Sequence, residues 1–182
     1  MWQRTHIWHV VVAMIAAFTI MNAAGQARAE STSDDPITST IIPTDVAPEL
    51  PGKSGIGRRI VYANKRQRVW VINSSNEVIR TFLVSGRRGV PTPGSYRVFS
   101  QSLSSFSPEL AGVTLRFMTR FAIGPHGGNV GFHELPLRYG KPMQTVNQLG
   151  TFRGGGCLRS TTADARFIFR WAKVGTPVVV VP

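Results

Sequence analysis

Residues 153–181 read RGGGCLRSTTADARFIFRWAKVGTPVVVV, a glycine-rich turn followed by a helical pattern and a β-branched run. Thr161 or Thr162 can cap a helix, with Asp164 in its first turn. Apolar residues then recur at spacings of three and four, which predicts one buried helical face; they are Ala165, Ile168, Phe169 and Ala172. A single amphipathic helix is therefore expected directly after the only cysteine of the chain.

The remainder of the folded part is patterned as strands. Runs rich in β-branched and aromatic residues predict strands over 58–63, 69–73, 78–84, 95–100, 113–122 and 176–181. Ser74-Ser75-Asn76 is a turn signal between two of them, which favours consecutive antiparallel strands. Gly175 is expected to end the helix. Residues 123–156 show little periodicity and are expected to form a long functional loop. The predicted fold class is mainly β with one short helix after the cysteine loop.

The N-terminus has the pattern of a secretory signal over residues 1–29. A short basic start leads into an apolar run, and Ala27-Arg28-Ala29 provides the small residues that a signal peptidase reads. Residues 30–56 are rich in Ser, Thr, Pro and Asp and are expected to form a disordered linker before a domain over 57–182. Export to the periplasm or cell wall, with no membrane span after cleavage, is the expectation; an uncleaved anchor is the alternative.

The charge is strongly basic and unevenly distributed. The chain has a formal net charge of +12, and the part from Lys53 onward holds 19 basic and 4 acidic residues. Such a domain concentrates polyanions around itself. Because export removes the chain from nucleic acid, the expected partners are anionic cell-wall polymers rather than DNA or RNA. The protein is expected to act as a monomer.

Cys157 needs an explanation, since one cysteine in an exported chain cannot form an internal disulfide. Intermolecular pairing, a buried structural thiol and a catalytic thiol are the open interpretations; a lipidated cysteine would stand at the start of the mature chain. The preceding glycines permit close approach of a substrate, and backbone amides of Gly156 and Cys157 can face an oxyanion. A thiol near a helix N-terminus, flanked by Arg153 and Arg159, is expected to have a lowered pKa and to favour the thiolate.

A thiol nucleophile requires a base, and the mature chain offers only His126 and His133. His126 lies in a glycine turn, where a local hydrogen bond is the simpler expectation. The two histidines and Glu134 would be the whole inventory of a metal site, so no metal is expected. The glycine run lacks the Gly-Lys-Ser/Thr pattern of a phosphate-binding loop.

The stretch from Arg58 to Val181 resembles the L,D-transpeptidase catalytic domain family. The resemblance rests on segments in the family's order: RIVY at 59–62, QRVWVI at 67–72, VSG at 84–86, TPGSY at 92–96, GFHELP at 131–136, GTF at 150–152, DA at 164–165 and VGTPVV at 174–179. It implies an L,D-transpeptidase-like β-sandwich or barrel. The implied reaction forms 3→3 cross-links between peptidoglycan stem peptides through a cysteine thioester, with release of D-alanine and no cofactor.

The resemblance also implies roles for individual residues. Cys157 would be the nucleophile and His133 the general base, with the Glu134 carbonyl fixing the tautomer of the imidazole. Gly156 would support the oxyanion through its amide. The residues implied in substrate binding are Arg159, Gly155 and Phe132; Arg159 bracing the loop instead is the alternative.

One motif departs from the family pattern. The family carries Ser or Thr, then His, then Gly before its cysteine, whereas this chain has Gly154, Gly155 and Gly156. The motif hydroxyl and imidazole are therefore missing while the Cys–His pair remains. Two other activities stay open: an L,D-carboxypeptidase that uses water as acceptor, and a catalytically impaired wall-binding module of the same fold. A sortase-like enzyme is disfavoured by the match at the closing helix.

Overall fold

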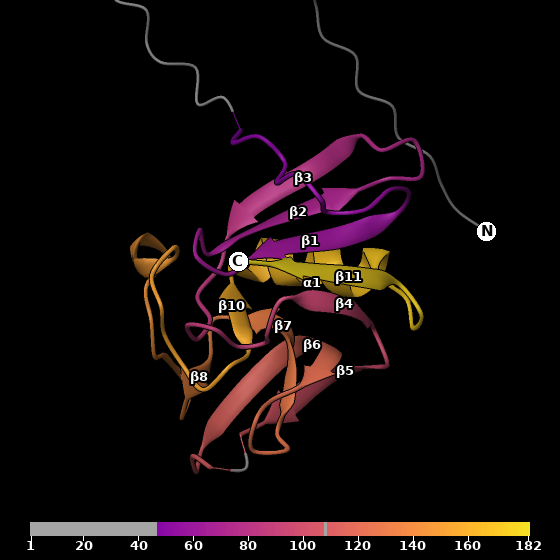
Figure 1. Ribbon diagram of the computed structural model, residues 1–182. Helices are drawn as coiled ribbons and strands as arrows, with labels where there is room; N and C mark the ends of the chain where they lie inside the picture. The colour runs from indigo at the N-terminus through magenta and orange to yellow at the C-terminus, as the bar shows by residue number, and fades with distance from the viewer. Residues whose placement is uncertain (1–46, 108) are drawn as a thin grey trace, which may run out of the picture. The chain divides into compact units, whose positions relative to one another are not determined.

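The computed structural model describes residues 47–107 and 109–182, and its strands form two sheets (Figure 1). The first sheet has the order β3-β2-β1-β11-β4, and the second has the order β10-β7-β6-β8-β9 with β5 paired to β6. The first contains β1 (Arg59–Ala63), β2 (Arg68–Ile72), β3 (Val78–Leu83), β4 (Gly94–Arg97) and β11 (Pro177–Val181). The second contains β5 (Ser100–Phe106), β6 (Val113–Ile123), β7 (Asn129–Glu134), β8 (Leu137–Arg138), β9 (Lys141–Pro142) and β10 (Leu158–Ser160). The expected signal sequence lies outside the described residues.

The first sheet is built on the predicted antiparallel strands. β1 pairs antiparallel with β2 and parallel with β11, so the end of the chain closes beside its first strand. The turn between β2 and β3 contains Asn76 at φ 66°, and the Asn73 side chain accepts hydrogen bonds from the amides of Ser75 and Glu77. Asparagine tolerates this left-handed backbone, which is why the turn could be predicted from the sequence. The mainly β fold is confirmed.

The main core lies between the two sheets and includes one face of α1 (Thr162–Trp171). The helical stripe is confirmed for Ala165, Ile168 and Ala172, all fully buried, while Phe169 is half-buried and packs edge-to-face on Phe117. The helix ends at Trp171, before the expected Gly175, which instead lies at φ 90° in the turn that leads to β11. Within the described ranges, no helix has both the length and the apolar character needed to span a bilayer.

The outer face of the first sheet is covered by the chain that precedes β1. The Trp70 indole donates to the Pro48 carbonyl at 2.8 Å, and Leu50 packs on a small apolar cluster around Trp70. Arg59 Nε donates to the Ser54 carbonyl at 2.6 Å. Pro48, Leu50 and Ser54 therefore contact residues of the first sheet.

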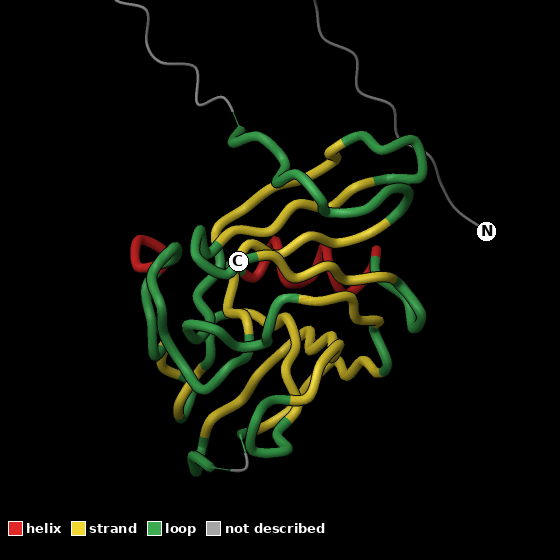
Figure 2. The backbone as a smooth tube through the Cα atoms, viewed as in Figure 1, coloured by secondary structure: helices red, strands yellow, loops and turns green. Residues whose placement is uncertain are grey.

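The second sheet corrects the expectation of one long loop over residues 123–156. Part of this stretch is strand (Figure 2), and β7 lies between β10 and β6. Five of the six residues of β7 are buried. Its sequence NVGFHE has buried polar residues at its end and a glycine in its middle, so no period of two is visible. Gly131 is needed for close packing, because a Cβ there would lie 2.5 Å from the Thr119 carbonyl oxygen. β10 was also missed, and it separates Cys157 from the helix.

The side chains of β6 switch sides of the sheet at Phe117, which has a left-handed φ of 57°. Beyond it, Met118 and Arg120 line a cavity, whereas before it the cavity is lined by Val113 and Leu115. A regular strand would keep residues of one parity on one face. The break leaves Arg116 free to reach the opposite side of the sheet.

The N-terminus of α1 is tied to the first sheet. Thr161 caps the helix as predicted, accepting from the Asp164 amide at 3.1 Å and donating to the Asp164 carboxylate at 2.6 Å. Arg80 on β3 binds the same carboxylate through Nε at 2.8 Å and Nη2 at 2.6 Å. This carboxylate joins helix, cap and sheet.

Replacement of Asp164 by alanine is expected to destabilise the fold by about 2 kcal/mol, since it removes a cap partner and leaves a half-buried arginine unpaired. Urea unfolding followed by circular dichroism measures the loss. Glu77→Ala in the exposed turn after β2 is the matched control and should change stability by less than about 0.5 kcal/mol. Equal effects in the two variants would show that the Asp164 network contributes no more than a surface carboxylate.

Candidate active site

Cys157 is placed by the parallel pairing of β10 with β7. Leu158 pairs with Phe132 and Arg159 with His133, so the cysteine stands just before β10 and beside the preceding part of β7. Its thiol donates to the Asn129 carbonyl at 3.3 Å. Because side chains two residues apart share a face, the pairing directs Cys157, Arg159 and His133 to one side of the sheet.

These side chains open on a cavity of about 480 Å³. It lies on the second sheet and is bounded by the β5–β6 hairpin and by the loops around residues 124–128 and 155–157. The residues that matter for chemistry are Cys157, His133, Arg159, Gly155, Gly156 and Arg120. His126 also lines the cavity from its glycine turn. Sequence-predicted residues from distant segments are thus brought together at one site.

His133 is buried on β7, with 2% of its surface exposed. Its Nδ1 lies 2.5 Å from the Glu134 carbonyl oxygen, which can only accept, so Nδ1 carries the proton and Nε2 is the free acceptor. No fully buried side-chain nitrogen or oxygen of the described residues lacks a partner, so Nε2 keeps access to the cavity. Burial lowers the pKa of His133 to about 4, partly offset by the hydrogen bond to Glu134. The imidazole is neutral at neutral pH.

The Glu134 side chain points away from the cavity and fixes the end of β7. Arg116 binds its carboxylate through Nε at 2.5 Å and Nη2 at 2.9 Å, and the Thr162 hydroxyl donates to it at 3.1 Å. The carboxylate is 2% exposed, so these donors satisfy a buried charge. They hold in place the backbone carbonyl that orients His133.

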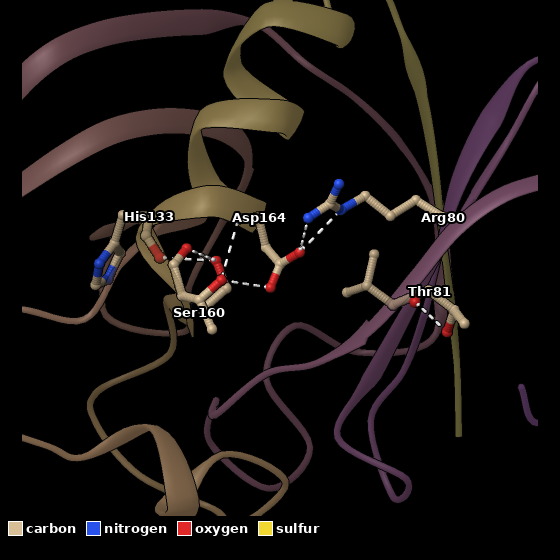
Figure 3. A network of polar contacts seen from close by, with 7 residues as sticks. Arg80, Thr81, His133, Ser160 and Asp164 are labelled. Atoms are coloured by element: carbon tan, nitrogen blue, oxygen red, sulfur yellow. Dashed lines mark hydrogen bonds and ion pairs between the residues drawn. The ribbon is translucent and has the colours of Figure 1, made fainter. Parts of the chain in front are cut away.

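A second set of contacts links His133 to the first sheet (Figure 3). The Ser160 hydroxyl lies 3.4 Å from the carbonyl oxygens of both His133 and Thr161. Thr161 in turn holds Asp164, which binds Arg80. The strand that carries the histidine is therefore braced through the helix cap.

The expectation that Cys157 has a lowered pKa and rests as a thiolate is wrong. Burial raises its pKa, and this outweighs the lowering effects of the Gly131 amide, Arg120 and Arg159. The helix N-terminus gives no help, because β10 stands between it and the cysteine and Thr161 already caps it. At neutral pH the thiol and the imidazole that line this cavity are therefore both uncharged.

Phe132 corrects another expectation, since its side chain does not reach the cavity. It is 1% exposed and stacks on Phe121 with ring centroids 4.8 Å apart in the main core. Successive side chains of β7 point to opposite faces of the sheet, so His133 points to the cavity and Phe132 to the core. Phe132 supports the strand from behind and is not available to substrate.

Arg159 braces the site as well as lining it. Its backbone exchanges hydrogen bonds with Ser85 at 2.9 and 3.0 Å, and its Nη1 donates to Gln144 Oε1 at 3.2 Å. The Gln144 amide also donates to the Ser85 hydroxyl at 2.8 Å. Sequence reasoning gave neither residue a role at the site: Gln144 belongs to no quoted motif, and Ser85 lies in the VSG segment without a signal that links it to Arg159. Both of the proposed roles of Arg159 remain compatible with its position.

The three glycines before Cys157 differ in their conformations. Gly154 has φ 88°, and a Cβ there would lie 2.8 Å from Arg159 Nη2. Gly156 has φ 149°, and its Cβ would lie 3.0 Å from Val90 Cγ1. The φ of Gly155 lies outside the positive range that favours glycine, and a Cβ added to it would meet no atom within 4 Å. Only the position of the missing motif histidine is open to a side chain.

We expect Gly154→Ser to lower stability by about 1–2 kcal/mol, because a serine would be strained in the left-handed region. Gly155→Ser should change stability by less than about 0.5 kcal/mol. Thermal unfolding of the two variants beside the wild type measures the difference. A larger loss in Gly155→Ser than in Gly154→Ser would contradict this description of the loop.

In the described part of the chain, no group of three or more His, Cys, Asp or Glu side chains is arranged to hold a metal ion. The groups that the cavity offers for chemistry are a cysteine, a histidine and backbone amides. Arg120 is the cavity residue that sequence reasoning overlooked; its position in an alternating strand looks like that of any exposed arginine. Only the pairing of β6 with β7 places it near the thiol.

Comparisons with solved structures identify similar folds. An L,D-transpeptidase from Mycobacterium smegmatis superposes with a TM-score of 0.55 at 18% identity, over 70% of this chain and 60% of that one. LD transpeptidase LdtMt1 in complex with imipenem gives 0.54 at 22% identity, over 70% and 60%. An L,D-transpeptidase from Stackebrandtia nassauensis gives 0.53 at 17%, over 71% and 59%. The chain thus spans about three fifths of the length of these proteins, and at such identities the similarity shows a shared fold.

A search of curated proteins gave no match. The family profile of YkuD, the L,D-transpeptidase catalytic domain, matches residues 58–180. This range runs from the start of the first sheet to its closing strand and includes the whole cavity. The chain belongs to the YkuD family of L,D-transpeptidase catalytic domains.

Proposed function

We propose that the protein is an exported peptidoglycan L,D-transpeptidase that forms 3→3 cross-links, with Cys157 as nucleophile and His133 as base. The observation that carries the proposal is the cavity that both side chains line. There His133 Nδ1 donates to the Glu134 carbonyl, which leaves Nε2 as the acceptor. The signal over residues 1–29, the linker that follows and the periplasmic or wall location belong to the same proposal.

The first half-reaction acylates the cysteine. The sulfur attacks the carbonyl between the third and fourth residues of a stem peptide while His133 Nε2 takes the thiol proton. The amides of Gly156 and Cys157 receive the oxyanion. Collapse breaks the C–N bond, and the imidazolium protonates the leaving D-alanine amine. The product is a thioester on Cys157.

The second half-reaction returns the enzyme to its starting state. The side-chain amine of another stem attacks the thioester, its proton passes to His133, and the sulfur leaves and is reprotonated. Arg159 and Gly155 line the path of the substrate. Water in place of the amine would give L,D-carboxypeptidase activity. The basic surface of the domain favours residence on anionic wall polymers in either case.

The test combines acylation with product analysis. Purified protein is incubated with a carbapenem, the class of the imipenem bound in the LdtMt1 structure, and then with a tetrapeptide stem. We expect one adduct per protein by intact mass, absent in Cys157→Ala, together with D-alanine release and a cross-linked dimer. D-Alanine without a dimer would identify a carboxypeptidase.

The competing function is a wall-binding module, and the loss of the motif side chains at Gly154 and Gly155 favours it. Folded protein that sediments with purified sacculi yet forms no adduct and releases no D-alanine would establish this function. It would also overturn the transpeptidase proposal.

A further inference from the structure

The cavity contains an arginine that the proposed chemistry does not use. Arg120 on β6 pairs directly with Gly131 on β7, and the Cys157 thiol approaches β7 from the other side, at the Asn129 carbonyl. Neighbouring strands lie about 4.8 Å apart, so an arginine on the next strand can reach across a glycine toward the thiol. Gly131 provides no side chain that would separate them.

The Arg120 guanidinium is held by neutral groups. Its Nη1 donates to the Ser102 hydroxyl at 2.9 Å and its Nη2 to the Ser105 hydroxyl at 3.0 Å, both from β5. The ion pairs of the described residues are Arg80–Asp164 and Arg116–Glu134, and neither includes Arg120. Glu109 lines the same cavity but makes no ion pair there. A positioned, half-buried positive charge thus faces the cavity without an anionic partner.

Arg159 is less free to take an anion. Its guanidinium donates to Gln144, and it packs so closely on Gly154 that a Cβ there would overlap with it. Both arginines lower the pKa of the Cys157 thiol, which places both within electrostatic reach of the sulfur. Two of the five guanidinium N–H groups of Arg120 donate to hydroxyls, which leaves donors for a carboxylate.

We propose that Arg120 binds the free α-carboxylate of the residue that leaves when Cys157 is acylated. This inference rests on the proposed function and adds a residue that selects a C-terminal acid. The leaving residue is attached to the carbon that the sulfur attacks, so its carboxylate lies one residue, about 3.8 Å along the chain, from the reacting centre. Arg120 on β6 and Cys157 just before β10 flank β7, so two strand spacings of about 4.8 Å separate their backbones. The long arginine side chain and one substrate residue can together bridge that gap.

Alkylation tests the anion site without relying on transpeptidase activity. Iodoacetate and iodoacetamide have nearly the same shape, and only the first carries a carboxylate. In each reaction the sulfur displaces iodide from carbon, one S–C bond forms, one C–I bond breaks, and the thiol proton passes to solvent. The ratio of the two rate constants therefore measures the carboxylate preference of the site.

We expect Arg120→Gln to lower the iodoacetate-to-iodoacetamide ratio by about tenfold or more, as loss of a charge-assisted contact implies. Arg120→Lys should retain most of the ratio. Arg170→Gln, which removes an equal charge at the exposed end of α1, should leave the ratio unchanged. Circular dichroism spectra like that of the wild type show that the variants are folded. A change in the pKa of the thiol affects both reagents and cancels in the ratio. An unchanged ratio in Arg120→Gln, or an equal fall in Arg170→Gln, would overturn the proposal.

A second readout separates this inference from the function on which it rests. For a tetrapeptide with a free C-terminal acid, Arg120→Gln should lower kcat/KM by about tenfold or more, with no such loss for the C-terminal amide. If the wild type turns over both peptides and the variant loses both equally, the assignment of Arg120 fails and the function stands. If the wild type turns over neither while the alkylation ratio still falls, the anion site stands and the transpeptidase fails.

Discussion

Replacement of His133 by asparagine will slow the acylation of Cys157 by about 10²–10⁴-fold at neutral pH, the usual contribution of a positioned general base. Asparagine can donate an N–H to the Glu134 carbonyl as the imidazole does, but it has no basic nitrogen to receive the thiol proton. The rate of carbapenem adduct formation, followed by intact mass, measures the effect. Because burial lowers the pKa of His133 to about 4, the wild-type rate should hold through mildly acidic pH and fall only as the pH approaches 4.

The pH profile distinguishes the neutral pair from an ion pair. A thiolate–imidazolium pair would be active while His133 is protonated. In that case His133→Asn would remove the positive charge that stabilises the thiolate. In the neutral pair the variant should regain rate as the pH rises through the raised pKa of the Cys157 thiol, because hydroxide then removes the thiol proton. His126→Asn, in the same cavity, is the matched control and should keep wild-type rates. A His133→Asn variant that reacts as fast as the wild type at neutral pH would exclude His133 as the base.

The protein will lose about 3 kcal/mol of stability through His133 alone as the pH falls from 6.5 to about 4. The sign follows from the lowered pKa. The unfolded chain takes up a proton below pH 6.5, whereas the folded state excludes it until about pH 4. The stabilisation is therefore complete above the unfolded value and disappears on acidification. Urea unfolding at neutral pH and at pH 4 measures the change.

His133→Asn is also the informative variant for stability. The carboxylates that titrate over the same range are common to both proteins, so the difference between wild type and variant isolates the histidine. We expect the gap between their free energies of unfolding to shift by about 3 kcal/mol between the two pH values, in favour of the variant at the acidic end. A gap that stays constant with pH would show that the folded imidazole titrates normally.

The parts of the fold that could be predicted are those with local signals. The helix carries its cap at Thr161 and its stripe of apolar residues within a dozen positions. β2 and β3 are separated by a turn that contains Asn76, a residue type that tolerates φ > 0. β7 has no such signal. Its pattern is interrupted by Gly131, and its His133 and Glu134 are buried because of partners on other elements.

For the candidate site, too, the sequence carried local motifs but not the contacts between distant strands. The motifs identified Cys157 and His133, since a lone cysteine had few histidines to choose from. They misjudged the thiol, because proximity in sequence to the helix suggested an electrostatic effect that three residues of β10 prevent. Phe132 was wrongly assigned to substrate binding, because β7, which directs its side chain into the core, was not predicted. Arg120 was not predicted at the site, because only the pairing of β6 with β7 brings it there. Burial and cross-strand neighbours are properties of the assembled fold.

Pro48 and Leu50 pack around Trp70 and keep its indole away from solvent. These two residues lie on the outer face of the first sheet, whereas the cavity lies on the second sheet. Shortening the chain past Leu50 would therefore expose Trp70 while leaving every residue that lines the cavity in place.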